Sequence, residues 1–255
     1  MTVKHPAIFV GHGAPTIALD AAKGAPLQAW GRALDKPRAV LVVSAHWERA
    51  PVTVGTVKTA PLLYDFYGFP QPLYQVRYPA PGAPDAADRA ADLLGAAHIE
   101  RSDERGLDHG VWTPLVHMFP AGDVPVVQLS LPTASGATAV FELGRQLAPL
   151  RDEGVLLMGS GNVTHNLRAI GPDGSSPEPW AMEFDDWVQD ALTRGDVDAL
   201  RAYRDHAPAL AQNHPTEEHW LPLLFAVGAA AGERVQFPVE GFEFQNLSRR
   251  SVQLG

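Results

Sequence analysis

Histidines are the residues of this sequence whose types and positions most clearly suggest chemistry. The chain of 255 residues contains 10 histidines and no cysteine, which excludes disulfides, thiolate catalysis and cysteine-based zinc sites. Any bound metal ion would therefore have imidazole or carboxylate ligands. His12, His46 and His165 each follow a short apolar run that is typical of a buried strand. Since ligands gather at the carboxyl ends of strands in α/β sheets, one metal ion or one substrate could contact all three.

Each of these three histidines also has a purely structural interpretation. His12 lies between two glycines and could be a polar turn residue, although glycines also let the backbone approach a ligand closely. His46 could end its strand and pack on the neighbouring tryptophan. His165 ends the segment Gly159–His165, which suits either an oxyanion-type loop or a plain connection from strand to helix. We favour a functional interpretation because a single shared ligand would account for all three positions.

Two further histidines lie next to predicted helices. His109 precedes a helix that is expected to begin near Trp112, where Asp108 could instead be a simple helix N-terminal residue and His109 a bystander. Thr216 is a plausible N-cap for a helix from Trp220 onward that is apolar on nearly every face and therefore buried. That helix would carry His219 into the interior, where a buried imidazole needs a partner such as a metal ion. The other histidines of interest have no such setting, and we interpret them as surface or core residues: His5, His98, His117 and His206.

Other common catalytic motifs are missing from the sequence. Ser160 lies between glycines but lacks the spacing of a G-x-S-x-G nucleophile elbow. The glycines around His12 lack the third glycine and the downstream acid of a dinucleotide site, and no P-loop is present. A metal site built from histidines therefore remains the favoured interpretation.

The elements that must position these residues alternate between strands and helices. This alternation predicts a single α/β domain over residues 1–255, with a central mixed, largely parallel sheet flanked by helices. The predicted strands are Ala7–Val10, Ala39–Ser44, Val52–Val57, Val124–Leu129, Val155–Met158, Val235–Val239 and Ser251–Leu254. The predicted helices are Pro26–Leu34, Pro84–Leu94, Trp112–Phe119, Ala137–Leu150, Trp180–Leu192 and Trp220–Ala231.

Composition and charge narrow the function classes. Hydrophobic residues make up 45% of the chain and charged residues 19%, which is enough apolar material for a sizeable core. The formal net charge of -9 argues against a nucleic-acid partner. Neither a signal-peptide pattern nor an apolar stretch of bilayer-spanning length occurs, so we expect no membrane association and a cytoplasmic location. The oligomeric state does not follow from the sequence.

Six motifs occur in an order that resembles a known enzyme family. They are Gly11–Pro15, Ser44–Trp47, Tyr64–Pro70, Leu107–Gly110, Gly159–Asn166 and Pro215–Pro222. Together they resemble the DOPA-type extradiol dioxygenases, part of the class III (LigB-like) ring-opening superfamily, over nearly the whole chain. The resemblance implies an α/β fold around a mixed sheet, and an activity that opens the ring of a catechol with O₂.

The resemblance also implies residue roles. It implies metal binding by His12, His46 and His219, with His165 beside the metal as acid/base or as a fourth ligand in a zinc form. It places His109 in the substrate pocket, and His109 is the next candidate for the base if His165 is not. The pocket loop implied by the resemblance carries Asp65, Phe66 and Tyr67.

The metal's identity is left open by the sequence. Ring-cleaving members of the wider superfamily use two histidines and a carboxylate on Fe(II), whereas three imidazoles also suit Zn²⁺. Glu217 and Glu218 remain alternative ligands in place of His219. We expect one divalent ion per chain, Fe(II) for ring cleavage and Zn(II) in the isolated protein. Two alternatives stay open: a zinc-dependent hydrolase that uses the same histidines, and a metal-binding protein without turnover.

Overall fold

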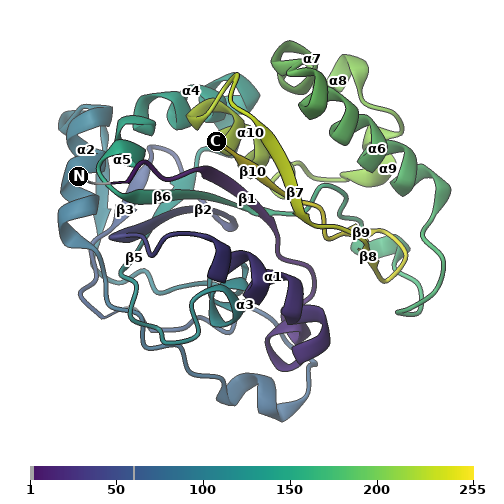
Figure 1. Ribbon diagram of the computed structural model, residues 1–255, viewed down its shortest axis with the longest axis horizontal. Coiled ribbons are helices and arrows are strands. Elements are labelled where there is room, and N and C mark those ends of the chain that lie inside the picture. Colours follow the sequence, from purple (N-terminus) through teal and green to yellow (C-terminus); the bar gives the residue numbers. More distant parts are fainter. Residues whose placement is uncertain (1–2, 60) are drawn as a thin grey trace.

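A mixed eight-stranded sheet forms the centre of the molecule in the computed structural model, which describes residues 3–59 and 61–255 (Figure 1). The strand order is β4-β3-β5-β2-β6-β1-β10-β7. These strands are β1 (Ala7–Gly11), β2 (Ala39–Glu48), β3 (Thr53–Gly55), β4 (Glu100–Ser102), β5 (Val126–Leu131), β6 (Val155–Gly161), β7 (Val235–Val239) and β10 (Ser251–Leu254). A separate small hairpin pairs β8 (Phe242–Glu243) with β9 (Leu247–Ser248).

The four central strands β5, β2, β6 and β1 run parallel to one another. β10 is antiparallel to β1 and to β7, and β3 is antiparallel to β5, so the sheet is mixed but mostly parallel, as the sequence predicted. β1, β5 and β6 are buried along their whole length, because helices cover both faces. The carboxyl ends of β1, β2 and β6 therefore lie side by side at one edge.

Helices lie on both faces of the sheet (Figure 1). A hydrophobic cluster on each face packs them against the strands. Alternate strand residues such as Phe9 and Leu41 face the layer of α4 and α10, whereas Ile8 and Val40 face the layer of α1 and α3. The helices are α1 (Ala21–Ala33), α2 (Pro84–Leu94), α3 (His109–Met118), α4 (Gly136–Leu147), α5 (Pro149–Asp152), α6 (Pro179–Arg194), α7 (Val197–Arg201), α8 (Tyr203–His206), α9 (Leu210–Asn213) and α10 (Leu221–Ala229).

Several boundaries differ from those expected. α1 begins five residues before Pro26, because the Asp20 carboxylate accepts hydrogen bonds from the first backbone N–H groups of the helix. The helix expected over residues 137–150 is divided, since Pro149 begins a new helical turn. Thr216 does not cap α10, which begins after Trp220, and its hydroxyl lies 3.1 Å from Glu218 instead. β4 and the short helices α7 to α9 were not predicted.

Within residues 3–59 and 61–255, no helix combines the length and apolar character needed to cross a bilayer.

Candidate metal centre and substrate cavity

The structure brings together three of the predicted metal ligands. His12 directly follows β1, His46 lies near the end of β2, and His219 lies just before α10. Each of the three offers a ring nitrogen, and these nitrogens all lie within 4.8 Å of one another. The strand and helix ends therefore converge as the sequence suggested, although the segments are far apart in the chain.

The spacing of these nitrogens suits a metal ion. The Nε2 atoms of His12 and His46 lie 3.3 Å apart. Two nitrogens that each lie about 2.0–2.1 Å from a tetrahedral ion are about 3.4 Å apart, so an ion between them would fit without rearrangement. The ring of His219 lies 5.4 Å from that of His12 and 4.9 Å from that of His46, and completes the group.

A buried serine determines which nitrogen of His12 is free. The Ser160 hydroxyl donates its one proton to the Gly110 carbonyl at 2.5 Å. Its oxygen can therefore only accept from His12, whose Nδ1 lies 3.0 Å away. Nδ1 of His12 thus carries the proton, and Nε2 presents a bare lone pair to the neighbouring histidines. A partner of this kind on the outer nitrogen is typical of metal-bound histidines.

His219 shows the same arrangement with a carboxylate. Its Nδ1 donates to Glu218 Oε1 at 2.9 Å, and its Nε2 is buried without a hydrogen-bond partner among the described residues. A buried polar nitrogen without a partner costs free energy, and a metal ion at this position would satisfy it. The residues present therefore fit a divalent metal ion.

Close backbone packing holds His219 at this position. The Asn162 N–H donates to the His219 carbonyl at 3.0 Å. A Cβ on Gly161 would lie only 2.2 Å from that carbonyl oxygen, so the approach of α10 to β6 requires glycine there. α10 is buried along its entire length, which fixes the position of its first residues.

A buried ionic network that sequence reasoning missed supports His46. Asp108 is fully buried, and its carboxylate accepts hydrogen bonds from Ser44 (2.7 Å), from Arg105 (2.8 Å) and from Gln128. Arg105 also donates to the His46 carbonyl at 3.0 Å. The side chain of Asp108 therefore braces β2 and does not cap α3. Its full burial could not be deduced from its neighbours in the sequence.

His109 is not a bystander. Its Nδ1 lies 2.9 Å from Asp65 Oδ1, and its ring lies 4.0 Å from the ring of His46 and 5.6 Å from that of Phe66. Asp65 and Phe66 belong to the pocket loop that the sequence singled out. The structure thus places His109 between the cluster of His12, His46 and His219 and that loop.

His165 lies beside the three histidines but stacks on one of them. Its ring is nearly parallel to that of His219, at 9° and 3.5 Å between centroids. No side-chain hydrogen bond fixes it within the described part of the chain. Of the two alternative carboxylate ligands, Glu218 holds Nδ1 of His219, whereas Glu217 forms an ion pair with Arg204 and does not line the histidine cavity.

The histidines of this centre are held in the neutral form. Burial, reinforced by the neighbouring imidazoles, lowers the pKa of His12, His165 and His219 well below the usual 6.5. Burial and the nearby His109 lower the pKa of His46 to about 4. Neutral imidazoles are the form that binds a metal ion.

A cavity of about 660 Å³ opens above the histidines. The predicted loop residues Asp65, Phe66 and Tyr67 line it, and Tyr67 is 93% exposed at the mouth. Phe69, from the motif Tyr64–Pro70, also lines it, together with three residues that sequence reasoning missed: Arg168, Ile170 and Phe244. Arg168 and Ile170 follow β6 and Phe244 lies between β8 and β9, and nothing in their local sequence marks these three as pocket residues.

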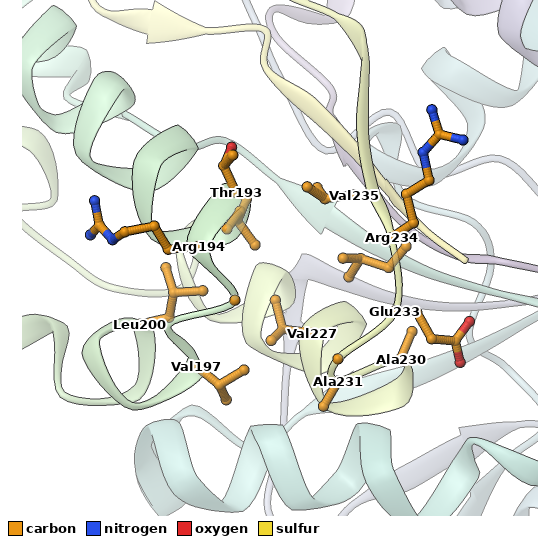
Figure 2. A pocket seen from close by; sticks show the side chains of 14 residues that line it. Thr193, Arg194, Val197, Leu200, Val227, Ala230, Ala231, Glu233, Arg234 and Val235 are labelled. Carbon is orange, nitrogen blue, oxygen red and sulfur yellow. The ribbon is translucent and has the colours of Figure 1, made fainter.

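A second cavity of about 340 Å³ lies among the ends of α6, α7 and α10 and the start of β7 (Figure 2). It is lined by Leu254, which pairs with Ala7 at the start of β1, so it lies at the opposite end of the strands from His12. No histidine lines it, and Figure 2 shows mainly small apolar side chains with Arg194 and Arg234 near them.

Comparisons with known proteins agree with this geometry. The family model described as the catalytic LigB subunit of aromatic ring-opening dioxygenase matches residues 7–255. The chain is 45% identical over 261 residues to a protein of Escherichia coli K12 named 4,5-DOPA dioxygenase extradiol, covering 100% of this chain and 96% of the relative. A protein of the same name from Beta vulgaris is 43% identical, covering 87% of this chain and 85% of that protein. A crystal structure of an uncharacterized protein from Escherichia coli K12 superimposes with a TM-score of 0.84 and 41% identity, over 98% of this chain and 100% of that one.

Proposed function

This chain belongs to the LigB family of aromatic ring-opening dioxygenases, and from that premise we propose that it opens the ring of a DOPA-like catechol by extradiol cleavage with O₂. It is an enzyme of the extradiol ring-cleavage class, as its relatives are. Both oxygen atoms of O₂ enter the product, and the ring bond that breaks lies beside the two hydroxyl-bearing carbons rather than between them.

One observation carries the proposal: three neutral histidines bring ring nitrogens within 4.8 Å of one another at the inner end of a cavity large enough for a substituted catechol. His12, His46 and His219 would hold one divalent ion. Fe(II) bound there would supply a site for both catechol oxygens and for O₂, and would pass electron density between them. A site of three imidazoles usually binds Zn(II) more tightly than Fe(II), so we propose that the protein is isolated mainly with Zn(II).

His165 is proposed to move the protons of the reaction. Its ring lines the cavity next to His219, and burial keeps it neutral and able to accept a proton from a catechol hydroxyl. To bind Zn(II) as a fourth ligand it would have to turn away from its stack on His219, because it does not share the close nitrogen spacing of the three other histidines. Phe66 and Tyr67 would contact the ring and side chain of the substrate from the loop opposite.

The test is to load the protein with Fe(II) without oxygen and then to measure O₂ uptake on mixing with a series of catechols. We expect uptake of one O₂ per catechol and a yellow product whose mass exceeds that of the substrate by two oxygen atoms. The Zn(II)-loaded protein is the matched control and should show no uptake. Ester or amide hydrolysis by the zinc form without O₂ uptake by the iron form would favour the hydrolase instead. If the protein binds the metal but catalyses neither reaction, the remaining interpretation is a metal-binding protein without turnover.

A further inference from the structure

Asp65 lines the cavity and also forms two hydrogen bonds with His109. Its Oδ1 lies 3.0 Å from the backbone nitrogen of His109 and 2.9 Å from Nδ1 of the same residue. Its Oδ2 lies 3.9 Å from Nδ1 of His46, beyond hydrogen-bond distance. Both hydrogen bonds of the carboxylate are therefore made to a single residue, His109.

These contacts fix the proton of His109. The backbone N–H can only donate, so Asp65 Oδ1 accepts that hydrogen bond, and as a carboxylate oxygen it accepts from the ring of His109 as well. Nδ1 of His109 must then carry the proton, and Nε2 is left bare. The ring lines the cavity, and its Nε2 forms no hydrogen bond within residues 3–59 and 61–255.

The same carboxylate takes over a role that the neighbour of His109 cannot fill. Asp108 occupies the N-cap position of α3, but its side chain is committed to Ser44, Arg105 and Gln128. Asp65 supplies the negative charge at this helix start from another loop, and bonds the first backbone N–H.

The loop that carries Asp65 is fastened independently of it. The Leu63 N–H donates to the Leu107 carbonyl at 2.7 Å, and the indole N–H of Trp112 donates to the Leu63 carbonyl at 3.0 Å. Removal of the Asp65 carboxylate should therefore leave the loop in place, and should affect mainly the ring of His109.

We propose that Asp65 is a positioning residue that acts through His109: it holds the imidazole so that the bare Nε2 accepts a hydrogen bond from a hydroxyl of the bound catechol. The inference rests on the proposed function for the identity of the ligand. The tautomer of His109, in contrast, is a property of the protein alone and can be measured without substrate.

The activity test is a double-mutant cycle on the Fe(II)-loaded protein. Asp65→Ala should lower kcat/KM by about 10–100-fold, as is usual for a residue that orients an active imidazole, without loss of bound metal. In the His109→Ala background the same change should lower kcat/KM by less than about threefold, because the two residues act as a unit. Asp65→Asn should have an intermediate effect, since the amide oxygen can still accept both hydrogen bonds. Asp196→Ala, which removes a carboxylate cap from α7, is the matched control and should leave kcat/KM unchanged.

The tautomer test uses ¹⁵N-labelled Zn(II)-loaded protein, with the His109 signals identified by their loss in His109→Ala. We expect Nδ1–H in the parent and a shift toward Nε2–H in Asp65→Ala. Equal losses of activity in the two backgrounds, an unchanged tautomer, or a parallel loss of metal would each overturn the proposal. If Asp65→Ala does not fold, the same cycle and spectra are measured with Asp65→Asn. A parent without O₂ uptake would defeat the proposed function, whereas the spectra would still decide the role of Asp65.

Discussion

The inner end of the cavity and its mouth are built in opposite ways. At the inner end His12 is 1% exposed and His219 is 4% exposed, and the outer nitrogen of each is hydrogen-bonded, to the buried Ser160 and to the partly buried Glu218. At the mouth Tyr67 is 93% exposed and Ile170 is 49% exposed. The difference indicates that the reactive groups are fixed by the hydrophobic core, where positions are unique, whereas the groups that meet the substrate's periphery lie on loops. Substitutions at the inner end should therefore reduce activity most, and substitutions at the mouth should reduce it least.

The largest effect is expected for the three metal-binding histidines. His12→Ala, His46→Ala or His219→Ala should abolish both metal binding and O₂ uptake, because three protein ligands leave no redundancy. Metal content by elemental analysis and O₂ uptake are measured on the same samples. Should His219→Ala keep the parent's metal affinity, a carboxylate is the third ligand, and Glu218 would be the first to test because it lines the cavity.

His165→Ala should separate chemistry from metal binding. Fe(II) occupancy should stay near that of the parent, because His12, His46 and His219 remain. Turnover should fall by about 10²–10⁴-fold, the usual contribution of a positioned proton-transfer group. The measurements are Fe(II) affinity and single-turnover ring opening. Full activity would remove His165 from the mechanism and leave His109 as the candidate base.

Ser160→Ala should weaken metal binding while every ligand remains present. The hydroxyl orients His12 through Nδ1, and loss of such a partner usually costs about 10–100-fold in metal affinity. Ser130→Ala is the matched control, because Ser130 is equally buried but bonds the backbone of Arg49, just after β2, and of Thr53 in β3. Competition with a chelator measures the affinity. Equal losses in both variants would point to a general effect on the sheet.

The metal-free protein should lose stability in mild acid, because it buries neutral histidines both at the inner end of the cavity (His46) and beside it (His214). Burial lowers the pKa of His46 and of His214 from 6.5 to about 4. Between these values the unfolded chain binds protons that the folded chain does not, so stability is fully present above pH 6.5 and falls as the pH decreases toward 4. Urea unfolding at a series of pH values measures this. Zn(II) should move the loss to lower pH, because metal and protons compete for the imidazoles. A free energy of unfolding that is constant over this interval would contradict the prediction.

The smallest effect is expected at the mouth. Tyr67→Ala should change the free energy of unfolding by less than about 0.5 kcal/mol, as is usual for an exposed side chain. KM for the catechol should rise a few-fold while kcat is retained, since the ring is far more exposed than any histidine of the metal centre. Steady-state kinetics and thermal unfolding test both statements. A loss of kcat comparable to that of His165→Ala would mean that the mouth closes over the reacting groups.

The sequence by itself determined the sheet and the residues that gather at its edge. Apolar runs that end in glycine and histidine indicated β1, β2 and β6, and a continuous apolar segment indicated the buried helix α10. These patterns are local, because the period of burial along a strand or a helix is set by neighbouring residues. The proximity of His12, His46 and His165 could be predicted because parallel strands end at a common edge, whereas His219 was indicated by the buried helix that follows it and by the resemblance.

Only the tertiary structure decided which nitrogen of His12 and of His109 is free. The partner of His12 is Ser160, which is 148 residues away, and the partner of His109 is Asp65, which is 44 residues away. No local pattern indicated that the side chain of Asp108 would be engaged elsewhere and that Asp65, from another loop, would bond the first N–H of α3. Hydrogen bonds of this kind depend on the positions of whole segments within a close-packed interior, and those positions follow from the packing of many side chains together.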